Sequence, residues 1–158
     1  MMTFKHIHFH WDDEAVAKMN ALDRLVYRSN QLGADTRITN TGGGNTSNKS
    51  NETDTLTGAQ GEVLWVKGSG GDLRTSKRDN FASVWLDKLN LMRARYEATT
   101  PRGAKSQIED DLVALYPHTI YNLSPRAPSI ATPLHGFVPH ACVDHMHPNA
   151  VIAIAASA

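Results

Sequence analysis

The segment that decides the fold is residues 41–71, TGGGNTSNKSNETDTLTGAQGEVLWVKGSGG, in which two glycine-rich loops flank an extended stretch. Residues 62–66 are rich in apolar and β-branched side chains, which is the pattern of a buried strand. Glycines before and after this stretch allow the positive φ angles with which a backbone can approach a ligand closely. Polar side chains in residues 45–47 add hydrogen-bonding groups, so the first loop predicts an anion-binding site, with a polar turn as the alternative.

Neither loop has the form of the two most familiar phosphate-binding motifs. The first loop lacks the Gly-Lys-Ser/Thr ending of a P-loop, and it does not open a helix with G-x-G-x-x-G. The second loop, residues 68–71, follows the pattern of a buried strand, and backbone amides at a strand end commonly meet a ligand. Each loop alone is a weak indication of function.

Helical and extended patterns alternate on both sides of this segment, which predicts an α/β fold. On the N-terminal side, apolar residues recur at helical spacing from Asp12, a suitable N-cap, to Gly33, a suitable helix end. Residues 35–41 alternate in the manner of a half-exposed strand. We therefore expect one long helix and then a strand before the first glycine loop.

On the C-terminal side, two further helices are predicted. An apolar stripe at helical spacing runs through residues 81–96. Ser76 and Asp79 precede it in capping-box spacing. A shorter stripe in residues 106–117 follows a second capping box and ends near a proline.

The composition describes an ordinary globular domain. The 158 residues include 16 Lys and Arg, 16 Asp and Glu and a single Cys, and 41% of them are hydrophobic. Balanced charge gives no electrostatic footprint for nucleic acid. A single Cys and a polar N-terminus without a leader pattern favour a cytoplasmic protein. The longest apolar stretch, residues 151–158, is far shorter than the about 20 residues that cross a bilayer, so no membrane span is expected.

A possible metal site lies at His145 and His147, just before Pro148. Residues two apart on a strand point to the same face, so the two imidazoles can converge on one metal ion. Pro148 suits the first turn of a following helix, which would place the pair at the end of a strand. Cys142 would face the other side of the strand, and we expect it to be a packed small residue. Structural roles for a lone H-x-H pair remain the alternative.

Three more histidines alternate near the N-terminus, at His6, His8 and His10. Chain termini are usually solvated, so metal binding there would be adventitious.

Four motifs, taken in order, resemble the class II aldolase/adducin family. Residues 44–47, GNTS, and 68–70, GSG, are similar to its two phosphate-contacting loops. Residues 128–135, PSIATPLH, resemble its Ser-Ser-(Asp/Glu)-Thr-Pro-x-His stretch, and the histidine pair at 145 and 147 resembles its zinc-binding pair. The resemblance implies a three-layer α/β fold with a central sheet flanked by helices, of which residues 1–158 would form the N-terminal portion, cut short at its C-terminus.

The subgroup that the sequence most resembles is the aldolase half of bifunctional rhamnulose-1-phosphate aldolase/short-chain dehydrogenase proteins. This implies an aldehyde-lyase that depends on zinc or another divalent metal and cleaves L-rhamnulose 1-phosphate to dihydroxyacetone phosphate and L-lactaldehyde. By resemblance, His145 and His147 hold the metal. The sugar phosphate would be held by Gly44, Asn45, Ser69, Gly70 and Ser129. A homo-oligomer is implied as well.

The sequence departs from the family at three points. Ala131 occupies the position of the family's proton-transferring carboxylate, and an alanine cannot transfer a proton. Ile130 stands where relatives often have a second hydroxyl. A catalytic zinc normally has three protein ligands, and the family's third histidine lies beyond this chain, although His135 or His140 would be a substitute.

Three functions therefore stay open. The first is the aldolase reaction, with activity made doubtful by the alanine. The second is a non-catalytic, adducin-like binding or structural domain. The third is another sugar-phosphate aldolase or epimerase of the same family.

Overall fold

The computed structural model describes residues 10–99 and 105–157, and its centre is a five-stranded sheet. The strand order is β4-β3-β2-β1-β5, and every pair of neighbours is antiparallel. The strands are β1 (Asn45–Thr53), β2 (Gln60–Lys67), β3 (Phe81–Trp85), β4 (Ile120–Asn122) and β5 (Cys142–His145). The strand predicted at residues 62–66 is confirmed as the middle of β2.

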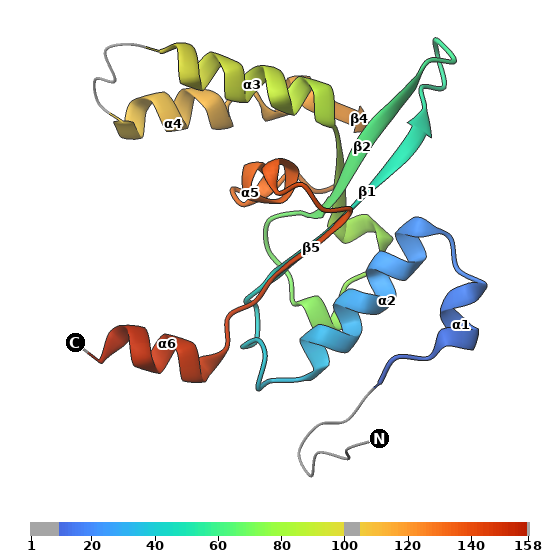
Figure 1. Ribbon diagram of the computed structural model, residues 1–158, viewed down its shortest axis with the longest axis vertical. Helices are drawn as coiled ribbons and strands as arrows, with labels where there is room; N and C mark the ends of the chain where they lie inside the picture. Colours follow the sequence, from blue (N-terminus) through green and yellow to red (C-terminus); the bar gives the residue numbers. More distant parts are fainter. Residues whose placement is uncertain (1–9, 100–104, 158) are drawn as a thin grey trace.

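Helices cover both faces of the sheet, as expected for a three-layer fold. The α-helices are α1 (Asp13–Ala17), α2 (Ala21–Ala34), α3 (Leu86–Ala98), α4 (Lys105–Val113), α5 (Thr132–Phe137) and α6 (Asn149–Ala156). Three short 3₁₀ turns are η1 (Leu73–Thr75), η2 (Arg78–Asn80) and η3 (Tyr116–Thr119). Helix α2 packs against β1, whereas α3 and α5 pack against β2 (Figure 1).

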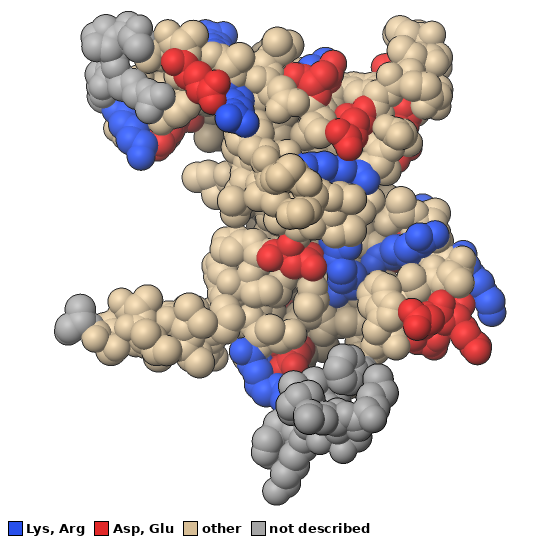
Figure 2. Space-filling model, viewed as in Figure 1, with Lys and Arg blue, Asp and Glu red and all other residues tan. Residues whose placement is uncertain are grey.

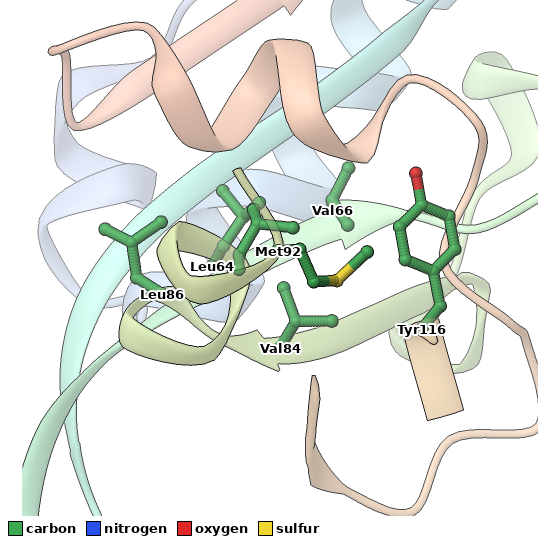
Figure 3. Packing of buried hydrophobic residues seen from close by; sticks show 7 residues of the cluster. Leu64, Val66, Val84, Leu86, Met92 and Tyr116 are labelled. Carbon is green, nitrogen blue, oxygen red and sulfur yellow. The ribbon is translucent and has the colours of Figure 1, made fainter. Parts of the chain in front are cut away.

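The main apolar core lies between the sheet and α3. Leu64 and Val66 of β2 and Val84 of β3 point to this side, where they meet Met92 of α3 and Tyr116 (Figure 3). Side chains of a strand alternate between its two faces, so the same strands also bury Val63 and Phe81 toward the other layer. Burial on both faces explains why β2 lacks the alternation of a half-exposed strand.

The N-terminal helix prediction is correct at its start and wrong in its length. Asp12 caps the N-terminus of α1, because its carboxylate accepts hydrogen bonds from the amides of Glu14 and Ala15. The chain then breaks, and Asn20 caps a separate helix, α2, by accepting from the amide of Asp23. A new cap inside an apolar stripe stops one helix and starts the next.

The strand predicted at residues 35–41 is wrong. The segment forms turns, in which the amide of Ile38 donates to the carbonyl of Asp35 and the Asp35 carboxylate accepts from the amide of Arg37. Such local bonds compete with a sheet ladder. The strand begins instead at Asn45, so residues 45–47, which the sequence places in a loop, belong to β1.

The helix predicted through residues 81–96 is half wrong. Phe81–Trp85 form β3, a buried strand between β2 and β4, and α3 begins at Leu86. The expected capping box is absent: Ser76 ends η1, and the Lys77 amide donates to the Asn80 side chain instead. An apolar stretch buried on both faces does not reveal by spacing whether it is helix or strand.

The third predicted helix is confirmed as α4, and the helix expected after Pro148 is confirmed as α6. Ser106 lies inside α4 rather than at its cap. Helix α6 projects from the body of the molecule with Val151 59% and Ile154 75% exposed (Figure 1). Acidic and basic side chains are mixed over the face shown in Figure 2, and α6 carries neither. Among residues 10–99 and 105–157, no helix has the length and apolarity to cross a membrane.

Candidate functional site

The two histidines predicted to bind metal converge in the structure. His145 ends β5, His147 follows it, and their Nε2 atoms are 3.2 Å apart. Two histidine nitrogens at about 2.0 to 2.1 Å from a tetrahedral zinc would lie about 3.3 Å from each other. Both histidines are half-buried. Spacing and donor type therefore fit a divalent metal such as zinc.

A backbone clamp holds this pair in position, and it is formed by Thr39, Asn40 and Gly44, before and within the first glycine loop. The amide of Asn40 donates to the carbonyl of His147 at 3.1 Å, and the amide of His147 lies 3.4 Å from Thr39 Oγ1. Gly44 has φ +81°, and a Cβ there would lie 3.1 Å from the carbonyl oxygen of His145. The glycine thus lets the loop pass close to the histidine strand.

No third metal ligand joins the pair within the part of the chain that the structure describes. His135 is completely buried, and its Nδ1 lies 2.7 Å from Ser47 Oγ. Burial, assisted by the charge of nearby His145, lowers the pKa of His135 to about 4, so this imidazole is neutral at neutral pH. His140 is exposed, and neither histidine completes a three-residue set.

Next to the histidine pair lies a group of buried polar side chains. Asn45 is the register partner of His145 on the neighbouring strand. Its side-chain amide donates to Ser129 Oγ at 2.8 Å and to the carbonyl of Lys67 at 3.0 Å. The sequence-predicted residues Asn45 and Ser129 are therefore brought together beside the histidine pair, although 84 positions separate them in the chain.

Some buried polar atoms of this region have no hydrogen-bond partner among the described residues. They are Asn45 Oδ1, Thr132 Oγ1, His135 Nε2 and, in the clamp, Asn40 Oδ1. A buried polar atom without a partner is costly, and a ligand or an ordered water commonly supplies one. This region thus has unused hydrogen-bonding capacity.

The second glycine loop forms the outer edge of the same region. Ser69 and Gly70 are both exposed, and Gly70 has φ +77°. Gly68 is buried, and its amide donates to the carbonyl of Asn80. A Cβ on Gly68 would lie 2.6 Å from Cβ of Arg126. The loop therefore presents Ser69 and Gly70 to solvent from a fixed base.

Lys67 is a charged residue of this site that the sequence analysis missed. Its side chain is 3% exposed, and its ammonium donates to the carbonyl of Gly70 at 3.2 Å. Desolvation by burial lowers the pKa of Lys67. The sequence feature that could have indicated Lys67 is its place directly after the apolar residues 63–66 and directly before Gly68.

Arg28 of α2 is a second missed residue, and it fixes the strand that carries the histidines. Its Nε donates to Asp144 at 3.0 Å, and its Nη2 donates to the carbonyl of Ser47 at 2.6 Å. These bonds tie α2 to both β5 and β1. No local pattern pairs an arginine with an aspartate 116 positions away.

Four further residues that the sequence singled out lie within the described parts of the chain. Ala131 immediately precedes α5, is half-buried, and offers no proton-transferring group. Ile130 is 84% exposed. The expectation that Cys142 is packed is wrong: the residue is exposed, because it lies on the edge strand and its thiol donates to Asn48 Oδ1. His10 is exposed, and His6 and His8 lie outside the described residues.

Comparisons with known proteins agree with this architecture. A family model described as the class II aldolase and adducin N-terminal domain matches residues 23–158. The chain belongs to this family.

The individual relatives are of two kinds. A Bacillus subtilis (strain 168) protein named uncharacterized oxidoreductase YuxG is 40% identical over 151 residues, which cover 95% of this chain and 20% of that protein. A solved structure of the N-terminal class II aldolase domain of a conserved protein from Thermoplasma acidophilum aligns with a TM-score of 0.71 and 28% identity. That alignment covers 99% of this chain and 65% of the other. The chain thus spans about a fifth of the curated relative's length.

Proposed function

We propose that this domain cleaves a ketose 1-phosphate by a metal-dependent retro-aldol reaction, with L-rhamnulose 1-phosphate as substrate. The products would be dihydroxyacetone phosphate and L-lactaldehyde. The observation that carries the proposal is the His145–His147 pair, 3.2 Å apart, beside the buried Asn45–Ser129 contact. The domain family supports lyase chemistry. A relative named an oxidoreductase, of which this chain matches one fifth, fits an aldolase part joined to a dehydrogenase part.

The residues of the site divide the work of such a reaction. Breaking the carbon–carbon bond leaves its electron pair on the phosphate-bearing fragment, while the other fragment becomes an aldehyde as its hydroxyl gives up a proton to solvent. The carbon that carries the electron pair then takes up a proton from solvent, which yields dihydroxyacetone phosphate. His145 and His147 would hold a divalent ion, which would supply a Lewis acid for the developing negative charge. The phosphate is oriented by the Ser129 hydroxyl, which Asn45 holds by donating to its oxygen, and by the loop at Ser69 and Gly70 through hydroxyl and backbone amide donors. Gly44 shapes the approach of its loop to His145.

The second candidate is a non-catalytic, adducin-like binding domain. The observation that favours it is Ala131, because no side chain at this position can move the proton that the reaction requires. Another sugar-phosphate aldolase or epimerase would use the same metal pair and the same loops. Assembly as a homo-oligomer and a cytoplasmic location are further parts of the proposal.

The test is the zinc content of the purified chain, measured by elemental analysis after dialysis. We expect about one zinc per chain in the wild type and its loss in the His145→Ala, His147→Ala double variant. The matched control is His140→Ala, which removes an exposed histidine nearby and leaves the pair intact. Equal zinc content in the wild type and the double variant would refute the metal assignment and, with it, the enzymatic proposal for this chain.

A further inference from the structure

Arg126 lies against the second glycine loop without being part of it. The residue belongs to the segment between β4 and α5, and its Nη1 is 3.6 Å from the point where a Cβ on Gly70 would lie. Its own Cβ is 2.6 Å from the corresponding point of Gly68. The amide of Ser69 faces the carbonyl of Ala127, the next residue, at 3.4 Å. The Arg126 side chain therefore runs along the loop and places its guanidinium at Gly70.

This guanidinium is not neutralised by the described residues around it. The ion pairs among residues 10–99 and 105–157 do not include Arg126, which is exposed. A carboxylate does face the nearby ammonium of Lys67, namely Asp72, but it already pairs with Arg74 at 3.7 Å. Two cationic groups thus lie close to Gly70 of the loop.

The two cations lie near different parts of Gly70. Lys67 is buried and donates to the carbonyl of Gly70, whereas Arg126 is exposed on the Cα side of that glycine. The positive charge of Arg126 also lowers the pKa of Lys67, as expected for two like charges near each other. An arrangement that brings two cations together is relieved by an anion between them.

We propose that Arg126 determines the charge specificity of this loop, so that the loop selects a dianionic phosphate monoester over a monoanion or an uncharged sugar. This inference rests on the proposed function, in which the loop binds the phosphate of the substrate. A guanidinium forms paired hydrogen bonds with phosphate oxygens, and its attraction to a dianion is twice that to a monoanion at the same distance. Its exposed position lets it close over a phosphate that Ser69 and Gly70 already contact.

The experiment measures ligand binding to the whole chain by calorimetry. A metal chelator is present, so that the result does not depend on metal bound at the histidine pair. The probes are glycerol 1-phosphate, a dianionic monoester, and dimethyl phosphate, a monoanionic diester. The variants are Arg126→Gln and Arg126→Lys. The matched control is Arg95→Gln on α3, which removes the same charge from an exposed position elsewhere.

We expect Arg126→Gln to weaken glycerol 1-phosphate binding about tenfold, which is the usual weight of one charge-assisted hydrogen bond. The loss for dimethyl phosphate should be smaller, the salt dependence of binding should become shallower, and Arg126→Lys should recover part of the affinity. The control should stay within about twofold of the wild type. A change in the monoester-to-diester ratio is a readout that a purely structural role would not move.

Two results would overturn the inference. Equal affinities in Arg126→Gln and Arg95→Gln would remove Arg126 from the site and leave the loop as a phosphate site intact. Absence of glycerol 1-phosphate binding in the wild type would overturn the inference together with the phosphate part of the proposed function. Loss of the zinc site alone would leave this experiment unaffected, so the two failures are distinguishable.

Discussion

The buried imidazole of His135 should make the stability of the domain depend on pH. Burial lowers the pKa of His135 from 6.5 to about 4, so the unfolded chain binds a proton more readily than the folded one. The resulting stability is fully present above pH 6.5 and is lost as the pH falls toward 4. From these two values the loss between about pH 7.5 and about pH 5 is about 2 kcal/mol.

The assay is urea denaturation of the wild type and of His135→Asn at both pH values, in a chelator. Asparagine can keep a polar atom near Ser47 Oγ and does not titrate, so all other ionisable groups are common to the two proteins. We expect the wild type to lose about 2 kcal/mol more than the variant on acidification. A direct NMR titration of His135 in the wild type keeps the test valid if the variant is unfolded. Equal pH dependence in both proteins, or a titration near pH 6.5, would refute the reasoning.

Two other substitutions test the fold and the chemistry. Gly33→Ala places a Cβ 2.2 Å from the backbone nitrogen of Arg74, and backbone cannot move aside as a side chain can. Alanine favours a helix over glycine by about 1 kcal/mol. We nevertheless expect the free energy of unfolding, measured in urea, to fall by about 1 to 3 kcal/mol. An unchanged or raised stability would contradict this close crossing of α2 and η1. Ala131→Glu should raise retro-aldol turnover by about 10² or more, measured as dihydroxyacetone phosphate released. No gain in a variant that binds zinc would favour the non-catalytic alternative.

Much of the local structure follows from the sequence, because the responsible interactions are local. The Asp12 cap, helix α4 and helix α6 each depend on neighbouring residues, and each is confirmed. Strand β2 is confirmed as well, because its run of apolar and β-branched residues suits a strand buried on both faces. The spacing of His145 and His147 likewise fixes their shared face on an extended chain, and the structure brings their nitrogens together.

Two of the wrong secondary-structure predictions share one physical cause. Residues 81–85 are apolar at a spacing that suits a helix, but pairing with strands on both sides makes them β3. Residues 35–41 alternate like a strand, but Asp35 engages its own neighbours in turns. In both cases competing interactions of similar strength are available, and the sequence pattern does not weigh them.

The sequence by itself determined the family, the order of the main motifs and the identity of the residues proposed to bind metal and phosphate. Only the tertiary structure decided which residues share one site. It placed Ser129 against Asn45, Lys67 beneath the second loop and Arg126 along that loop, through contacts between segments that are remote in the chain. Charges become part of a site when folding brings them together and removes water from between them, and no local pattern records that step.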